Sequence, residues 1–264
     1  MTVTIKTLKE RKDAGEKFSC LTAYDAAFAG LLSDQGIDVL VVGDSLGMVL
    51  QGKDSTVPVS VDDMVYHTQS VARAGPQSLI MADMPFMSYA TTETSMANAA
   101  RLMRAGAHMV KLEGSDWMAD TIQRLSERGV PVCAHLGLTP QFVNKLSGYR
   151  VQGRDNQAAD RMVAHARMLV EAGSDIILLE CVPAPLAERI TSEVSVPVIG
   201  IGAGPDTDGQ VLVLHDMLGI TQGHRPRFVK DFLAGTGSVA EAVSAYDRAV
   251  KTGQFPTEEH SFRG

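Results

Sequence analysis

Short apolar runs recur along the chain, and most of them end in a charged or polar residue. The clearest run covers residues 39–42 (VLVV) and is followed by Gly43 and Asp44. A continuous run of aliphatic residues is typical of a strand that is buried on both faces, as in a parallel sheet. The same pattern predicts further strands at Phe18–Thr22, Leu79–Ala82, Met109–Leu112, Val132–Ala134, Ile176–Leu179, Val198–Ile201 and Val211–Leu214.

Segments with helical spacing separate these runs. Their apolar residues recur three or four positions apart, and a glycine often follows as the C-cap. We expect helices at Ile5–Ala14, Ala26–Gln35, Val61–Ala74, Thr92–Arg104, Trp117–Arg128, Asn156–Ala172, Pro185–Glu193 and about 240–250. Residues 136–155 are rich in glycine and are expected to be mostly loop.

This alternation predicts an α/β fold with a parallel sheet. Because about eight strand–helix units follow one another without a linker, we predict that residues 1–264 form a single (β/α)8 TIM barrel domain. A short helix would precede the barrel and a C-terminal tail would follow it. An open doubly wound sheet is the alternative fold. The tail at 255–262 is polar like a disordered segment, but its two phenylalanines favour packing against another part of the protein.

Composition and charge exclude some classes of partner. The net charge of −7 argues against nucleic acid, and no apolar run is long enough to cross a membrane. The charged N-terminus has no apolar segment of the kind found in secretory signals, and the three cysteines have no zinc-like spacing. We therefore expect a cytoplasmic protein with reduced thiols.

Ionisable residues stand where the predicted strands end, and in a parallel barrel these ends surround the active site. The residues placed there are Asp44, Asp83, Lys111, Glu113, His135 and Glu180. Each also has a structural interpretation, because a loop carboxylate can cap a helix and a buried histidine can be satisfied within the core. Their recurrence on five strands favours one shared site.

The chemistry of these residues suits a divalent cation and a base. Two carboxylates such as Asp44 and Asp83 suit Mg²⁺, which takes oxygen ligands and leaves positions for water and substrate. Lys111 and Glu113 lie two positions apart on one strand and share a side, so an inward salt bridge is the alternative to a functional role. Glu180 follows four apolar residues, which suits a poorly solvated general base, although it could instead pair with the lysine.

Residues 200–205 (GIGAGP) form a glycine-rich stretch directly after a predicted strand begins. It does not match the dinucleotide-binding fingerprint, because it lacks both the glycine at the sixth position and a clear helix start. A loop of this kind can still hold a phosphate or a planar ligand through close approach of its backbone. We keep this loop as a hypothesis for the binding site of such a ligand.

Several short motifs follow one another along nearly the whole chain. They are 21–25 (LTAYD), 42–48 (VGDSLGM), 82–86 (ADMPF), 109–114 (MVKLEG), 134–140 (AHLGLTP), 179–183 (LECVP), 199–204 (IGIGAG), 255–256 and 260–262. Taken together and in this order, they carry a resemblance to the 3-methyl-2-oxobutanoate hydroxymethyltransferase (ketopantoate hydroxymethyltransferase) family of pantothenate biosynthesis. The resemblance implies a barrel of the phosphoenolpyruvate/pyruvate type that assembles as a homodecamer. The implied enzyme transfers a hydroxymethyl group from 5,10-methylenetetrahydrofolate to 3-methyl-2-oxobutanoate.

The resemblance also assigns roles to residues. It implies that Asp44 and Asp83 hold Mg²⁺ with Glu113 nearby, and that Glu180 is the catalytic base. The substrate-binding residues that it implies are Asp44, Ser45, Asp83, Lys111 and His135. In this mechanism Mg²⁺ is a Lewis acid that stabilises the enolate formed when C3 of the substrate loses its proton.

Two other classes of protein are alternatives. A lyase with the same type of barrel would cleave a carbon–carbon bond through the same enolate. Such lyases usually carry a catalytic cysteine in a flexible loop, whereas Cys20, Cys133 and Cys181 lie in or beside predicted strands. A catalytically inactive barrel would have lost one of the key acids, and all of them are present in this chain.

Overall fold

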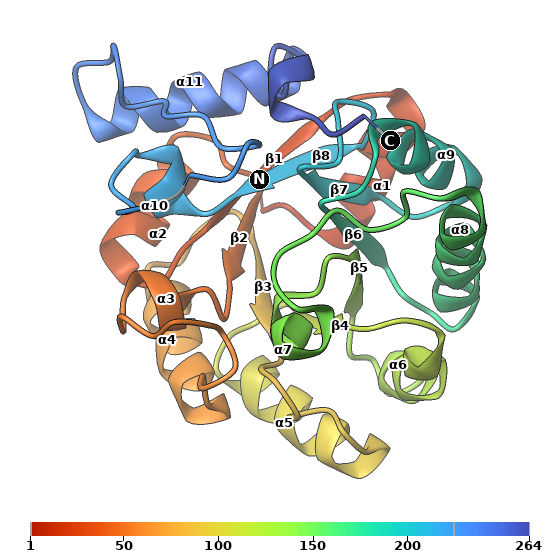
Figure 1. The fold of residues 1–264 in the computed structure, drawn as a ribbon. Coiled ribbons are helices and arrows are strands. Elements are labelled where there is room, and N and C mark those ends of the chain that lie inside the picture. The colour runs from red at the N-terminus through yellow and green to blue at the C-terminus, as the bar shows by residue number, and fades with distance from the viewer. Residues whose placement is uncertain (1, 224, 264) are drawn as a thin grey trace.

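Eight parallel strands form a closed barrel at the centre of the computed structural model, which describes residues 2–223 and 225–263 (Figure 1). The strands pair in chain order, and β1 closes the barrel against β8. They are β1 Phe18–Thr22, β2 Val39–Val42, β3 Leu79–Asp83, β4 Met109–Glu113, β5 Val132–Gly137, β6 Ile176–Glu180, β7 Val198–Ile201 and β8 Gly209–Leu212. The predicted (β/α)8 fold is therefore confirmed, and the open sheet is excluded.

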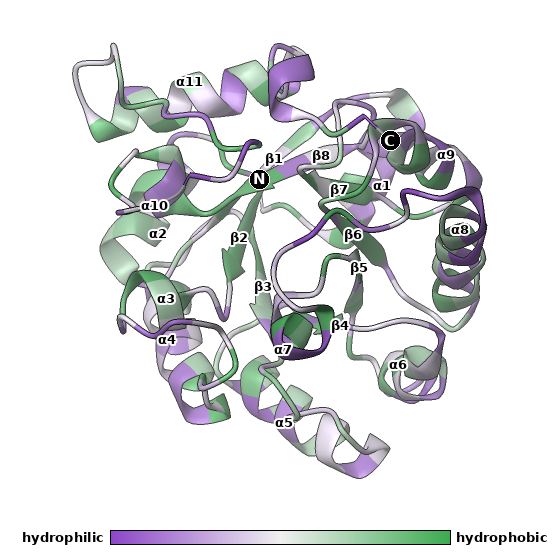
Figure 2. Cartoon of the chain, in the orientation of Figure 1, coloured by the Kyte–Doolittle hydropathy of each residue, from purple (hydrophilic) through white to green (hydrophobic). Residues whose placement is uncertain are grey.

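Helices surround the strands, with apolar residues concentrated in the centre and hydrophilic residues on the outer helical faces (Figure 2). The α-helices are α1 Ile5–Ala14, α2 Ala26–Asp34, α3 Leu46–Val49, α4 Val61–Arg73, α5 Thr92–Arg104, α6 Ala119–Ser126, α7 Val143–Leu146, α8 Asn156–Glu171, α9 Ala184–Glu193, α10 Leu214–Met217 and α11 Val239–Lys251. The described residues also form short 3-10 helices, which are η1 Asp116–Met118, η2 Pro140–Phe142 and η3 Glu258–His260. Within the described part of the chain, no helix is long and apolar enough to cross a membrane.

Polar caps fix where the longer helices begin. The Ser60 side chain accepts a hydrogen bond from the Asp63 backbone, and the Asp63 carboxylate accepts one in return, which forms a capping box at the start of α4. The Asp155 carboxylate accepts a hydrogen bond of 2.8 Å from the Ala158 backbone at the start of α8. These bonds satisfy N–H groups that have no partner within their own helix.

The prediction for the last strand was wrong by two residues. The strand is Gly209–Leu212, not Val211–Leu214, and Leu214 already belongs to α10. Its first residue pairs with Phe18 of β1, and a Cβ atom on Gly209 would lie 2.5 Å from the ring of that phenylalanine. The strand therefore begins with a glycine and a glutamine, which an apolar pattern does not reveal.

Two other segments also differ from the predictions. The helix predicted at Trp117–Arg128 is divided into η1 and α6. The region predicted as loop, 136–155, contains the end of β5, η2 and α7. Strand β5 continues to Gly137 because this glycine pairs with Glu180 of β6. Helices of three or four residues are too short to show a helical period in the sequence.

The C-terminal tail packs against the barrel, as we expected from its two phenylalanines. Phe255 is 3% exposed and makes edge-on ring contacts with Phe232 and Tyr246. Further along, the Ala184 N–H at the start of α9 donates a hydrogen bond of 2.9 Å to the carbonyl of Phe262. The tail thereby holds the loop between β6 and α9.

Helix α11 is attached to the seam where the barrel closes. The Tyr246 hydroxyl lies 2.9 Å from both the Cys20 carbonyl of β1 and the Gln210 carbonyl of β8. Its ring is fully buried. One side chain therefore connects the last long helix to both strands of the β1–β8 pair.

We predict that Tyr246→Phe lowers the free energy of unfolding by about 1–2 kcal/mol, because a buried hydroxyl that bonds two carbonyls is lost. Urea denaturation at one fixed protein concentration measures this change. Tyr66→Phe is the control, since Tyr66 is 67% exposed, and its effect is expected to stay within about 0.5 kcal/mol. Equal stabilities for the two variants would contradict the role of Tyr246 at the seam.

Candidate active site

The structure brings the predicted ionisable residues together at the carboxyl ends of β2 to β6. Strand register produces this arrangement, because Asp83 lies opposite Lys111, Glu113 opposite His135, and Glu180 opposite Gly137. Side chains two positions apart share a side of a strand, so the lysine and the glutamate of β4 both face the barrel interior. All of these residues except Glu180 are buried.

Lys111 lies at the centre of the cluster. Its Nζ atom is 3.2 Å from Asp83 Oδ1, 3.6 Å from Glu113 Oε1 and 3.2 Å from His135 Nδ1. The inward salt bridge with Glu113 therefore exists, but it is one contact of several. Burial lowers the pKa of Lys111, yet the charges of Asp83 and Glu113 outweigh this effect and raise the pKa overall. The ammonium group is thus charged throughout the neutral range.

His135 connects two glutamates. Its Nδ1 atom lies 3.3 Å from Glu113 Oε1, and its Nε2 atom lies 3.3 Å from Glu180 Oε2. Burial and the charge of Lys111 lower the pKa of His135, but the two glutamates raise it to about 9. The imidazole therefore contacts acids on both sides, unlike a histidine that merely fills the core. Among the described residues, Glu180 makes its ion-pair contact with this histidine and not with the lysine.

Asp44 and Asp83 lie side by side, as a shared cation would require. The Asp44 N–H donates a hydrogen bond of 3.1 Å to Asp83 Oδ2. Neither carboxylate caps a helix, since the residue before α3 is Ser45 and the cap of α5 is Thr91. The structural interpretation of these two acids as helix caps is therefore excluded.

Gln141 is a part of the site that the sequence analysis missed. Its side-chain Nε2 donates hydrogen bonds to Asp44 Oδ2 at 2.8 Å and to the Met84 carbonyl at 2.9 Å. Its backbone N–H donates to Glu113 Oε2 at 3.0 Å. A polar residue directly after the motif 134–140 was the available signal, but a neutral amide in a predicted loop does not stand out. Gln141 fixes the orientation of two of the acids.

Ser45 stands at the edge of the cluster. Its Oγ atom is 2.9 Å from the hydroxyl of Tyr24, which is itself buried. A Cβ atom on Gly43 would lie 2.8 Å from this Oγ, so the glycine provides the room in which the serine side chain turns inward. The same Cβ would lie 3.6 Å from Asp83 Oδ2, so the serine hydroxyl and this carboxylate both approach Gly43, where the hydroxyl can donate to a ligand oxygen.

The cluster carries more negative than positive charge. Burial raises the pKa of Asp44, and the charges of Asp83 and Glu113 raise it further. Burial also raises the pKa of Asp83, although Lys111 opposes the effect. Burial would raise the pKa of Glu113 as well, but His135 and Lys111 outweigh this and lower it. Asp44 and Asp83 are thus the two acids whose negative charge is least compensated by neighbouring groups.

The two aspartates fit a magnesium ion with few protein ligands. Among the residues that the structure describes, Asp83 Oδ1 is buried without a hydrogen-bond partner and has only the ion-pair contact with Lys111. No group of three His, Cys, Asp or Glu side chains forms a complete ligand set in these residues. Mg²⁺ suits such a site because it keeps water and substrate as its other ligands. Both oxygens of Glu113 already have partners, which favours contact with the ion through water.

Glu180 differs from the other acids in its exposure. Its side chain is 16% exposed, compared with 2% for Glu113 and 4% for Asp83. Its carboxylate is therefore less desolvated than the apolar run before it led us to expect. It lies at the rim of the cluster, where a bound substrate can reach it.

The glycine stretch at 200–205 is filled by the protein itself. A Cβ atom on Gly202 would lie 2.8 Å from the ring of Phe228 and 3.1 Å from that of Phe262. A Cβ on Gly200 would lie 2.7 Å from the Thr207 hydroxyl. The stretch therefore packs against the tail and gives no open cradle, so the structure does not support the hypothesis of a planar ligand here.

A closed parallel barrel with acids, a lysine and a histidine at one mouth defines an α/β-barrel enzyme, and solved structures agree on the fold. The structure of 2,3-dimethylmalate lyase, a member of the PEP mutase/isocitrate lyase superfamily, superposes with a TM-score of 0.60 at 16% identity, covering 83% of this chain and 84% of that one. Phosphonopyruvate hydrolase in complex with oxalate and Mg²⁺ gives 0.64 at 14% identity, covering 97% and 99%. These likenesses show the fold.

The particular family follows from sequence. The family model for ketopantoate hydroxymethyltransferase matches residues 2–258, and the chain belongs to this family of transferases. The 3-methyl-2-oxobutanoate hydroxymethyltransferase of Marinobacter nauticus is 68% identical over 263 residues and covers 100% of both chains. The Vibrio parahaemolyticus enzyme of that name is 60% identical over 259 residues, covering 98% of both. Hahella chejuensis 3-methyl-2-oxobutanoate hydroxymethyltransferase 2 is 58% identical over 262 residues, covering 99% of both.

We predict that Asp44→Asn stabilises the metal-free protein. A raised pKa means that folding disfavours the charged carboxylate, so the cost of Asp44 grows as the pH rises above the ordinary value of 3.8. At pH 7 in EDTA, the melting temperature of the variant is expected to rise by a few degrees, equivalent to about 1–3 kcal/mol. Differential scanning calorimetry measures this shift.

Asp13→Asn is the control for this prediction, because Asp13 is exposed on α1 and its change is expected to leave the melting temperature within about one degree. An excess of Mg²⁺ should remove or reverse the advantage of Asp44→Asn. A metal-free variant that melts below the wild type would show that the Asp44 carboxylate is not under electrostatic strain.

Proposed function

We propose that this chain transfers a one-carbon unit from 5,10-methylenetetrahydrofolate to C3 of 3-methyl-2-oxobutanoate. The C3–H bond breaks, a new carbon–carbon bond forms, and one water supplies the hydroxyl group of the product. Tetrahydrofolate and 2-dehydropantoate are released. The observation that carries the proposal is the cluster of buried acids around Lys111 and His135 at the barrel mouth. The names of the close relatives support 3-methyl-2-oxobutanoate as the acceptor, and the family resemblance supports the folate donor.

Asp44 and Asp83 are the residues that would hold Mg²⁺. When bound, the ion supplies a Lewis acid that stabilises negative charge on the ketone oxygen of the substrate. Lys111 and His135 offer N–H groups on the same side of the barrel, so they can bind substrate oxygens as this charge develops. Ser45, next to the aspartates, can donate to the substrate carboxylate.

Glu180 is the best candidate for the base that removes the C3 proton. Both carboxylate oxygens of Glu113 are occupied by partners, whereas Glu180 is at the rim and has its contact with His135 on one oxygen. That contact orients the carboxylate and leaves the other oxygen to face a substrate. A carboxylate base of this kind contributes about 10²- to 10⁴-fold to a proton transfer.

We predict that Glu180→Gln slows the exchange of the C3 proton by at least about 100-fold while binding of the oxo acid is retained. Exchange of 3-methyl-2-oxobutanoate with deuterium oxide in the presence of Mg²⁺, followed by proton NMR, measures this step without folate. Glu188→Gln on the exposed face of α9 is the matched control and should exchange at the wild-type rate. Wild-type exchange in Glu180→Gln would assign the base to another residue.

The family resemblance also leads us to propose a cytoplasmic homodecamer with no nucleic-acid or membrane partner. Light scattering of the purified chain is then expected to give about ten times the mass of one chain, 28.2 kDa. The mass of a monomer or dimer at micromolar concentration would contradict this assembly.

A further inference from the structure

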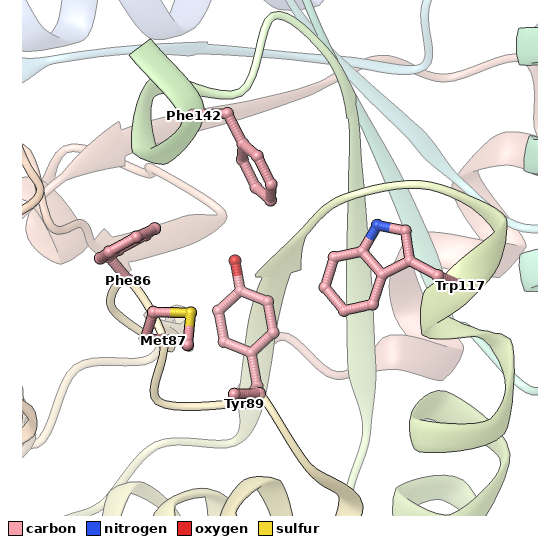
Figure 3. A pocket seen from close by; sticks show the side chains of 6 residues that line it. Phe86, Met87, Tyr89, Trp117 and Phe142 are labelled. Carbon is pink, nitrogen blue, oxygen red and sulfur yellow. The ribbon is translucent and has the colours of Figure 1, made fainter. Parts of the chain in front are cut away.

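An apolar cavity of about 260 Å³ opens beside the candidate active site (Figure 3). It is lined by Phe86, Met87, Tyr89, Ala90, Trp117 and Phe142, and we call it the aromatic pocket. These residues come from the segments that follow β3, β4 and β5. The pocket therefore opens at the same end of the barrel as the acids, and the mechanism described above makes no use of it.

Tyr89 joins the pocket to the acids. Its hydroxyl lies 3.0 Å from the Glu113 carbonyl and 2.6 Å from Gln141 Oε1, and the same glutamine amide donates to Asp44. Two hydrogen bonds thus separate the pocket from a proposed magnesium ligand. Because the Tyr89 hydroxyl already contacts these two acceptors, the face of its ring is the part that is available to a ligand.

Trp117 forms a second flat wall. Its ring is parallel to that of Tyr89, with 4° between the planes and 6.1 Å between the centroids (Figure 3). The two rings lie beside one another in Figure 3, and the tryptophan is 50% exposed, so aromatic surface stays open. A Cβ atom on Gly114 would lie 2.5 Å from Cζ2 of the indole, so this glycine allows the ring to rest against the backbone.

The other walls are apolar and partly exposed. Phe86 and Met87 are 38% and 61% exposed, and Phe142 faces them across the pocket (Figure 3). Met87 has a φ of 61°, in the left-handed region that non-glycine residues rarely adopt. Strained backbone and exposed large apolar side chains both cost stability, and their coincidence next to an active site indicates a ligand.

We propose that the aromatic pocket binds the flat bicyclic ring of the reduced-folate donor. This assignment rests on the proposed function and adds to it the place of the second substrate. The donor must bring its one-carbon unit to an oxo acid held at Asp44 and Asp83, and the pocket adjoins that position. Flat conjugated rings stack on open aromatic faces. The volume is below the roughly 300 Å³ of the smallest pockets for drug-sized ligands, which fits the ring system with the remainder of the folate outside.

Trp117→Ala tests the assignment by removing the open indole face. Stacking of a base on an aromatic side chain is worth about 1–3 kcal/mol, so the Kd of tetrahydrofolate, measured anaerobically by calorimetry, is expected to rise about 5- to 150-fold. The KM for the methylene donor should rise similarly, while the KM for the oxo acid changes by less than about twofold. Trp117→Phe, which keeps a flat ring, should recover most of the affinity.

Tyr66→Ala is the matched control, because Tyr66 is an exposed aromatic residue on the outer helix α4, and its affinity for tetrahydrofolate should equal that of the wild type. If Trp117→Ala does not fold by circular dichroism, Phe142→Ala and Trp117→Phe provide the comparison. Unchanged tetrahydrofolate affinity in the folded alanine variants, Trp117→Ala or Phe142→Ala, overturns the assignment. If the same variants also change the mass of the assembly, the pocket is instead a contact with a second copy of the chain.

The two proposals can fail separately. Mg²⁺-dependent exchange of the C3 proton by the wild type needs no folate, so its absence would overturn the proposed function whatever the pocket binds. Exchange by the wild type together with unchanged tetrahydrofolate affinity in Trp117→Ala would overturn the assignment of the aromatic pocket alone.

Discussion

The ammonium group of Lys111 is the interaction on which the site depends, because it holds together carboxylates that would otherwise repel one another. It lies 3.2 Å from Asp83 and 3.6 Å from Glu113, with side chains that are 5% exposed or less. In a poorly solvated interior, an uncompensated charge of this kind costs several kcal/mol. Removing the lysine would therefore affect the whole cluster and not one contact. His135 extends the same compensation to Glu180 at the rim.

Lys111 and His135 do not neutralise all of the negative charge, and the remaining charge explains why the site can bind a cation. Four acids, Asp44, Asp83, Glu113 and Glu180, share two groups that can carry positive charge, so two negative charges are left over when all six are ionised. One divalent cation cancels that excess. The barrel supplies the stability that such a site costs, through strands whose residues are almost all buried and mostly apolar, and through α11, which connects β1 to β8. A stable scaffold thus carries a charge distribution that is balanced only when a divalent cation is present.

Much of the fold, and the ionisable residues at the strand ends, could be predicted from the sequence for physical reasons. Buried parallel strands such as β2 and β6 are uniformly apolar, so the carboxylates that follow or end them, Asp44 and Glu180, mark the mouth of the barrel. Strand β8 was misplaced because it begins with Gly209, whose lack of a side chain accommodates Phe18. Gln141 and the aromatic pocket were missed for a different reason. They lie in loops whose spatial neighbours are set by tertiary packing, and neither a neutral amide nor scattered aromatic residues form a periodic pattern.

We propose that Asp44 and Asp83, with their excess negative charge, form the binding site of a magnesium ion whose coordination the substrate completes. Calorimetric titration of Mg²⁺ in the presence of 3-methyl-2-oxobutanoate tests this claim most directly, with the wild type compared to Asp83→Asn. One ion per chain is expected in the wild type, and the variant should bind it at least about tenfold more weakly, since a charged oxygen ligand is lost. Equal Mg²⁺ affinity in the two proteins, or a Mg²⁺ affinity that does not change when the oxo acid is added, would contradict this proposal.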